Sequence, residues 1–218
     1  MAGRGLLLDF GGVMTSSLYG RMAEFCVESG LPADAILTAL RAPEGRSVLA
    51  LAEAGRVPQA DFESMLARQL GLPADGLIAR LVNADVLPPR AETADLVRRA
   101  RAAGIPVGLL SNSWGGDGHD IYAGHDFAAL FDVVVISHQV GLRKPEAPIF
   151  ELAAERLGVP PRDCVFVDDT RANVATARDV GMAAVHYTGE PAQLAEVERL
   201  LGLPESTDGA SADGAGDG

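Results

Sequence analysis

The sequence predicts an α/β protein: a Rossmann-like parallel sheet with helices on both faces, together with an all-helical inserted cap. Short uninterrupted apolar runs alternate with longer amphipathic segments, which is the pattern of strands buried on both faces and joined by helices. One stretch, 16–86, breaks this alternation because its periodicity is helical throughout. We therefore expect a core domain formed by 1–15 and 87–203, with 16–86 as the cap.

The expected strands are apolar runs that end in glycine or polar residues. The first, Leu6–Leu8, runs into Asp9 and a Gly-Gly turn. The later runs, in chain order, are Ile105–Leu110, Val133–Ile136, Val165–Val167 and the weaker Ala183–Tyr187. In a parallel sheet, the residues that follow the strands meet at the carboxyl edge, where open α/β folds bind ligands.

Amphipathic segments between these runs predict the helices of the core. These segments are Thr93–Ala103, Pro145–Leu157, Ala172–Val180 and Ala192–Leu201. Within the cap, glycine and proline predict turns at 30–32, 43–45, 55 and 71–73. The final stretch, 204–218, contains no large apolar residue, so we expect a disordered acidic tail.

Composition narrows the class of protein. The net charge of −12 disfavours a nucleic-acid partner, and no run approaches the roughly 18 apolar residues of a membrane span. The apolar run before Asp9 is too short for a secretory signal core. We expect a cytoplasmic monomer or homodimer that binds neither nucleic acid nor membrane. Cys26 and Cys164 lie in apolar patterns, which favours buried free thiols over a disulfide or a metal pair.

Lys144 is the only lysine among 18 basic residues. Lysine offers a compact, strongly hydrated charge, whereas arginine offers a broad planar fork. Chance in an arginine-rich composition would also leave one lysine, but this one lies in the turn that follows the Val133–Ile136 run. We interpret Lys144 as a group that binds a small anion.

Polar residues follow four of the expected strands: Asp9, Ser111, Lys144 and Asp169. Each alone is ordinary, because an aspartate after a strand often caps a helix and a loop serine or lysine is usually solvated. In a parallel sheet, however, all four would converge at one edge. Their order along the chain therefore predicts a catalytic site.

These residues lie in four motifs: Asp9–Val13 (DFGGV), Leu110–Asn112 (LSN), Lys144–Glu146 (KPE) and Phe166–Thr170 (FVDDT). With these motifs in this order, the chain resembles the haloacid dehalogenase superfamily, many members of which carry a cap between the first and second motifs. The resemblance covers nearly the whole chain before the tail. It implies a hydrolase in which an aspartate attacks the substrate.

The chemistry of the residues agrees with that resemblance. An aspartate such as Asp9 can attack phosphorus and form an aspartyl-phosphate. Mg²⁺ prefers oxygen ligands, which Asp9 and Asp169 supply, and the resemblance adds the Gly11 backbone carbonyl as a ligand and Asp168 as a supporting residue. Lys144 and Ser111 would bind the phosphoryl oxygens. We therefore expect a magnesium-dependent phosphatase for a small phosphorylated metabolite, with sugar phosphates among the candidates.

Two asparagines have less defined roles. Asn112 is a candidate phosphate or substrate contact. Asn173 lies four residues after Asp169, where it would either tie the metal-site loop together or cap the following helix.

Gly11 departs from the pattern of the phosphatases in this superfamily, which typically carry a second aspartate there as general acid and base. Such catalysis typically contributes about 10²–10⁴-fold. Three explanations remain open. The substrate has a good leaving group, or the acid comes from elsewhere, with His119, Asp120 and His125 as candidates, or the protein has lost turnover and binds a ligand or a partner.

Two alternatives to a phosphatase therefore stand: a non-catalytic binding or regulatory protein, and a 2-haloacid dehalogenase. The dehalogenase needs no magnesium, yet paired Asp168 and Asp169 would place negative charge beside the attacking carboxylate, which favours the phosphatase.

The cap should set the substrate, with Trp114 as either a pocket wall or a hydrophobic plug. The basic residues of the cap that could contact an anionic substrate are Arg21, Arg41, Arg46, Arg56, Arg68 and Arg80.

Overall fold

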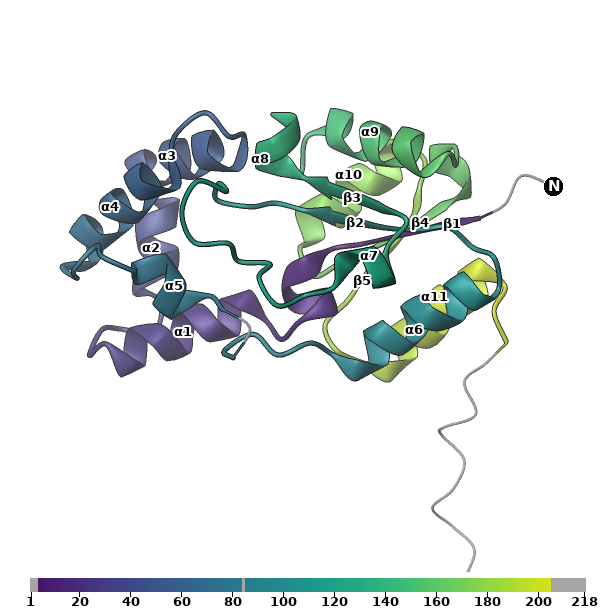
Figure 1. Cartoon of the computed structure of the whole chain (residues 1–218), viewed down its shortest axis with the longest axis horizontal. Helices are drawn as coiled ribbons and strands as arrows, with labels where there is room; N and C mark the ends of the chain where they lie inside the picture. Colours follow the sequence, from purple (N-terminus) through teal and green to yellow (C-terminus); the bar gives the residue numbers. More distant parts are fainter. Residues whose placement is uncertain (1–3, 84, 205–218) are drawn as a thin grey trace, which may run out of the picture.

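A computed structural model describes residues 4–83 and 85–204 (Figure 1). Five strands form one parallel sheet in the order β3-β2-β1-β4-β5. The strands are β1 (Gly5–Leu8), β2 (Val107–Ser111), β3 (Val133–Ile136), β4 (Cys164–Asp168) and β5 (Ala183–His186). The central strand is β1, in which Leu7 pairs with Gly108 on one side and Phe166 on the other. The predicted parallel sheet is confirmed.

Helices cover both faces of the sheet (Figure 1). Successive side chains of a strand point to opposite faces. Leu6 and Leu8 of β1 therefore pack in the core beneath α6 (Ala91–Ala102) and α11 (Pro191–Leu201). Leu7 packs on the other side, against α9 (Ala147–Leu157) and α10 (Arg171–Asp179). This two-sided burial explains why the strands read as continuous apolar runs.

Five further helices lie beyond the carboxyl ends of the strands, at the left of Figure 1. They have a hydrophobic core of their own, built around Met22, Ile36, Phe62 and Leu66. We call this segment, residues 18–81, the helical unit. Its helices are α1 (Leu18–Glu28), α2 (Ala35–Arg41), α3 (Pro43–Glu53), α4 (Gln59–Leu70) and α5 (Leu77–Leu81).

Residues 43–45 and the start of α9 differ from the sequence prediction. Residues 43–45 form the first turn of α3, so they are not a separate turn. A Cβ on Gly45 would lie 2.0 Å from the Ala39 carbonyl oxygen, so glycine is needed for α2 and α3 to approach this closely. Helix α9 begins at Ala147 and not at Pro145, because Arg143–Glu146 forms a turn closed by the Glu146 N–H and the Arg143 carbonyl, 2.9 Å apart.

The Gly-Gly turn predicted after β1 is present as an irregular helical turn, Phe10–Met14. Two short helices that flank β3, α7 (Phe127–Leu130) and α8 (Ser137–Val140), were not anticipated, because four residues are too few for a periodic pattern. Helix α8 separates β3 from the turn that carries Lys144.

The remaining sequence predictions have mixed outcomes. Cys26 and Cys164 are buried and free, as expected. The tail predicted for 204–218 lies outside the described residues, apart from Pro204. Among the described residues, no helix has both the length and the apolar character needed to cross a bilayer.

Candidate active site

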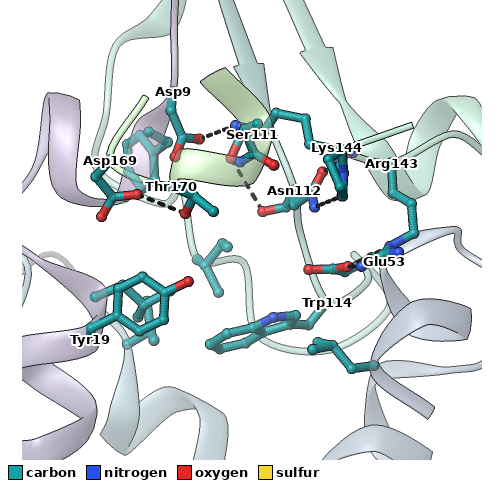
Figure 2. A pocket seen from close by; sticks show the side chains of 18 of the residues that line it. Asp9, Tyr19, Glu53, Ser111, Asn112, Trp114, Arg143, Lys144, Asp169 and Thr170 are labelled. Atoms are coloured by element: carbon teal, nitrogen blue, oxygen red, sulfur yellow. Dashed lines mark hydrogen bonds and ion pairs between the residues drawn. The ribbon is translucent and has the colours of Figure 1, made fainter. Parts of the chain in front are cut away.

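A cavity of about 270 Å³ lies where the carboxyl ends of the strands meet the helical unit (Figure 2). The structure brings together there the four residues that the sequence placed at strand ends: Asp9, Ser111, Lys144 and Asp169. Asp9 directly follows β1, Ser111 ends β2, and Asp169 directly follows β4. The parallel sheet therefore positions functional groups from segments more than 100 residues apart.

Lys144 bridges two carboxylates. Its Nζ lies 2.7 Å from Asp9 Oδ1 and 2.7 Å from Asp168 Oδ2, and its side chain is almost fully buried. Burial opposes the ammonium charge, but Asp168 and Asp9 outweigh it and raise the pKa of Lys144. Lys144 is therefore a permanent cation beside Asp9.

The pKa of Asp9 is raised to about 7, first because burial disfavours its charged form. The Lys144 cation opposes this shift, whereas the neighbouring Asp168 and Asp169 carboxylates add to it. The Asp9 side chain is 13% exposed and lines the cavity. Its charge thus depends on the cations around it.

Asp168 is fully buried and its oxygens are occupied by donors of the protein. Besides Lys144, Asn173 Nδ2 donates to both oxygens at 3.0 Å, and the Thr170 N–H donates to Oδ1 at 2.7 Å. Asn173 lies inside α10, whose N-cap is Thr170. Of the two roles considered for Asn173, the structure therefore displays the loop tie and not the helix cap.

Three carboxylates form a group that could hold a metal ion: oxygens of Asp9, Asp168 and Asp169 lie within 4.8 Å of one another. Asp9 and Asp169 line the cavity, and hard oxygen donors of this kind suit a small divalent cation. Burial raises the pKa of Asp169 to about 6, with Asp168 adding to the shift and the Thr170 hydroxyl opposing it. The residues present therefore fit a metal site in which Asp168 supports two outer carboxylates.

Ser111 is held by a tyrosine that the sequence analysis missed. Tyr122 Oη donates to Ser111 Oγ at 2.8 Å, and burial raises the pKa of Tyr122, so the phenol keeps its proton. In the sequence, the loop 115–124 is mostly polar and glycine-rich. The apolar pair Ile121-Tyr122 within it is the feature that indicates a segment packed inward. Tyr122 thereby fixes the orientation of the Ser111 hydroxyl.

The three polar residues proposed as alternative acids do not line the cavity. His119 Nε2 lies 2.7 Å from the Val82 carbonyl, the Asp120 carboxylate accepts from the Tyr122 N–H, and the His125 ring packs against Phe10. Trp114 combines both roles considered for it, because it lines the cavity and also packs on Phe62 of the helical unit.

Asn112 holds the backbone of Lys144. Its Nδ2 donates to the Lys144 carbonyl and its Oδ1 accepts from the Lys144 N–H, both at 2.9 Å (Figure 2). Both polar groups of this side chain are thereby engaged. Asn112 positions the turn that delivers the ammonium group to Asp9.

A second ion pair at the cavity joins the helical unit to the core, and sequence reasoning did not anticipate it. Arg143 Nε donates to Glu53 Oε2 at 2.7 Å, where Glu53 is the last residue of α3 (Figure 2). Burial raises the pKa of Glu53, and the Arg143 guanidinium opposes that shift. None of the six arginines named above as cap residues lines the cavity.

A parallel sheet in this order, with an aspartate after β1, a serine ending β2, a lysine after β3 and an aspartate pair at the end of β4, defines a haloacid dehalogenase-like hydrolase. A family model described as haloacid dehalogenase-like hydrolase matches residues 4–181. The chain belongs to this family.

Its relatives include both phosphatases and dehalogenases. The chain is 30% identical over 151 residues to a sesquiterpene phosphatase of Aspergillus oryzae, covering 69% of this chain and 77% of that protein. It is 32% identical over 95 residues to an (S)-2-haloacid dehalogenase of Pseudomonas putida, covering 44% of this chain and only 42% of that protein. In fold it is similar to a HAD family enzyme of Bacteroides thetaiotaomicron solved with magnesium and inorganic phosphate, with a TM-score of 0.61 at 21% identity over 86% of this chain and 96% of that one.

Proposed function

We propose that the protein is a magnesium-dependent phosphatase that hydrolyses a small phosphorylated metabolite through an aspartyl-phosphate on Asp9. One observation carries this proposal. Lys144 holds the Asp9 carboxylate at 2.7 Å, and two further carboxylates lie beside it at the carboxyl ends of the strands. Asp9 would attack phosphorus while the bond to the alcohol oxygen breaks, and water would then cleave the aspartyl-phosphate. The products are the free alcohol and inorganic phosphate.

In this proposal, Asp9 and Asp169 hold Mg²⁺, with the Gly11 carbonyl as a further ligand and Asp168 in support. The bound ion would supply positive charge that reduces the repulsion between a carboxylate and a phosphate. Lys144 supplies a second cation, held on its other side by the buried Asp168. The Ser111 hydroxyl, which accepts from Tyr122 and donates to the Asn112 carbonyl at 3.3 Å, would turn to donate to a phosphoryl oxygen.

The comparisons support phosphoryl chemistry over halide displacement. The phosphatase relative is matched over a larger share of this chain than the dehalogenase relative. The enzyme of similar fold was solved with magnesium and phosphate, the two species that this site would bind. Lys144 offsets the charges of Asp9 and Asp168, but the third carboxylate, Asp169, would still hinder attack by Asp9 unless a further cation lay beside it.

The test is phosphate release from acetyl phosphate and p-nitrophenyl phosphate by the wild-type protein and by Asp9→Asn, each with Mg²⁺ and with EDTA. We expect turnover only by the wild-type protein with Mg²⁺, and a loss of at least about 10³-fold in kcat for Asp9→Asn. Glu155→Gln, an exposed carboxylate on α9, serves as the control and should retain activity. Turnover that survives in EDTA, or halide release from 2-chloropropionate without metal, would contradict the proposal.

A further inference from the structure

The cavity has two walls of opposite character. The wall at the strand ends carries the polar groups described above. The facing wall is mostly hydrocarbon: Figure 2 shows the rings of Trp114 and Tyr19 across the cavity from Asp9, Ser111 and Asp169. The apolar side chains that complete the lining are Leu18, Leu49, Val82, Leu87 and Ile121. A phosphate at Asp9 would therefore direct its organic part towards apolar side chains.

The positive charges around the cavity are already paired within the protein. Among the described lining residues, the cations are Lys144 and Arg143, and each is bound to carboxylates, Arg143 to Glu53. The arginines of the helical unit do not line the cavity, and two of them form ion pairs away from it: Arg21 with Glu28, and Arg68 with Glu44. No unpaired cation among the described lining residues is available for a second anionic group of a substrate.

A sugar would be poorly solvated in this cavity. Most of its hydroxyls would leave water for hydrocarbon, because the Tyr19 hydroxyl and the Trp114 indole N–H are the only hydrogen-bonding groups that these apolar-wall side chains offer, and a buried hydroxyl without a partner is unfavourable. A carboxylate in the leaving group would be less favourable still, because the Arg143 guanidinium at this cavity is already paired with Glu53. The volume of about 270 Å³ also lies just below the usual range of ligand pockets, which suits one ring or a short chain.

We infer that the substrate is a phosphate monoester of an apolar alcohol or phenol, with an uncharged hydrocarbon part about the size of a substituted benzene ring, packed against the Trp114 wall. This inference rests on the proposed phosphatase function and narrows its substrate class. The sugar phosphates considered from the sequence are thereby disfavoured.

The test compares 4-propylphenyl phosphate with O-phosphotyrosine. Both release a phenol of similar acidity and similar size, so they differ chiefly in the charged ammonium and carboxylate of the tyrosine. We expect kcat/KM to be at least about 100-fold higher for 4-propylphenyl phosphate. Equal rates, or faster hydrolysis of O-phosphotyrosine, would overturn the inference. Acetyl phosphate, whose leaving group is too small to reach the apolar wall, reports whether the phosphatase proposal itself holds.

Binding gives a readout that does not require turnover. Trp114 is the only tryptophan of the chain and lines the cavity, so its fluorescence reports occupancy. In Asp9→Asn, 4-propylphenol should change this signal at concentrations at least about tenfold below those needed for tyrosine. A response to tyrosine at equal or lower concentration would refute the apolar subsite, even in a protein that hydrolyses no phosphate.

A matched pair of variants on α3 localises the effect. Leu49 lines the cavity, whereas Leu51, on the same helix, is 38% exposed and does not. Leu49→Gln should reduce the preference for 4-propylphenyl phosphate over O-phosphotyrosine by about tenfold, because it replaces hydrocarbon contact with an amide. Leu51→Gln should leave the preference unchanged. Equal effects of the two substitutions would place the apolar contact outside this wall.

Discussion

The two glycines after Asp9 are present for different reasons. Gly12 has a φ of +82°, and a Cβ at this position would lie 2.1 Å from Asp169 Oδ2, so glycine is required for Asp169 to approach Asp9. Gly11 has an extended backbone with a φ of −69°, and its Cβ would lie an ordinary 3.5 Å from the Leu18 side chain. The backbone at Gly11 therefore leaves room for an aspartate side chain, so steric hindrance does not explain the absence of an acid there.

This difference predicts that Gly11→Asp folds and supplies a general acid. We expect kcat for an unactivated substrate, such as a phenyl phosphate, to rise by roughly 10²-fold, because the new carboxyl can protonate the leaving oxygen. Hydrolysis of p-nitrophenyl phosphate, whose leaving group needs little protonation, should change much less. Steady-state rates on the two substrates measure the effect.

Gly11→Asn has nearly the same shape without the acid, so it should show no gain on either substrate. If Gly11→Asp remains folded and binds substrate but gains nothing on phenyl phosphate, then another group already protonates the leaving oxygen. Gly12→Ala, in contrast, should displace Asp169 and weaken metal binding.

At the residue scale, the sequence was informative where function depends on position relative to a strand. Asp9, Ser111, Lys144 and Asp169 could be placed because the ends of parallel strands meet. Tyr122 and Glu53 could not be placed in this way. Tyr122 lies in a loop without periodicity, and Glu53 reaches the site only because α3 packs beside the turn that carries Arg143. Such contacts depend on tertiary packing that a local pattern does not encode.

At the scale of elements, the Glu53–Arg143 pair joins α3 to the turn before Lys144. The Glu53 side chain is only 10% exposed and that of Arg143 is 24% exposed, so neither charge is well solvated. Removing one partner of a buried pair leaves an uncompensated charge and typically costs about 3–5 kcal/mol. The pair therefore couples the position of the helical unit to that of the lysine.

Arg143→Leu should accordingly lower the free energy of unfolding, by roughly 2–3 kcal/mol because Arg143 is partly exposed. Without Arg143, burial raises the pKa of Glu53 further, so the folded state holds the Glu53 proton to higher pH than the unfolded state does. The variant then loses stability as pH rises towards that pKa. The difference in free energy of unfolding between the wild-type protein and Arg143→Leu should therefore be larger at pH 8 than at pH 5. Urea unfolding at both values measures it.

The exposed Arg68–Glu44 pair provides the control. Its side chains are 63% and 52% exposed, so Arg68→Leu should change the free energy of unfolding by less than about 1 kcal/mol. A deficit in Arg143→Leu that is no larger than this, or that does not depend on pH, would mean that Glu53 finds another partner.

Longer elements could be predicted and short ones could not. The core helices and strands lie within two or three residues of the expected bounds because their apolar periodicity is long or continuous. Helix α8 and the turn at Phe10–Met14 are too short to show a period, yet they set the approach of Lys144 and the spacing between Asp9 and Asp169. The sequence therefore located the site more reliably than it described the loops that shape it.

At the scale of the whole molecule, the fold gathers like charges. Asp9 comes from near the start of the chain and Asp169 lies 160 residues later, and the sheet brings both beside Asp168. Their pKa values are raised to about 7 for Asp9 and about 6 for Asp169, chiefly by burial and partly by mutual repulsion. In metal-free protein the folded state therefore binds protons that the unfolded state has released, and stability falls as pH rises from about 4 towards 8.

Magnesium should reverse this loss of stability at high pH, because it replaces the protons on the Asp9 and Asp169 carboxylates. At a concentration about 100 times its dissociation constant, the ion would stabilise the folded state by about 2.7 kcal/mol and raise Tm by roughly 5–10 °C. The increase should be larger at pH 8 than at pH 5, where protons compete for Asp9 and Asp169. Calorimetry in Mg²⁺ and in EDTA measures it, and Asp169→Asn should lose most of the increase while Glu155→Gln keeps it. An equal Tm in Mg²⁺ and EDTA at pH 8 would show that these carboxylates hold no such ion, since a cation that links the end of β1 to the end of β4 must stabilise the pairing of these two strands.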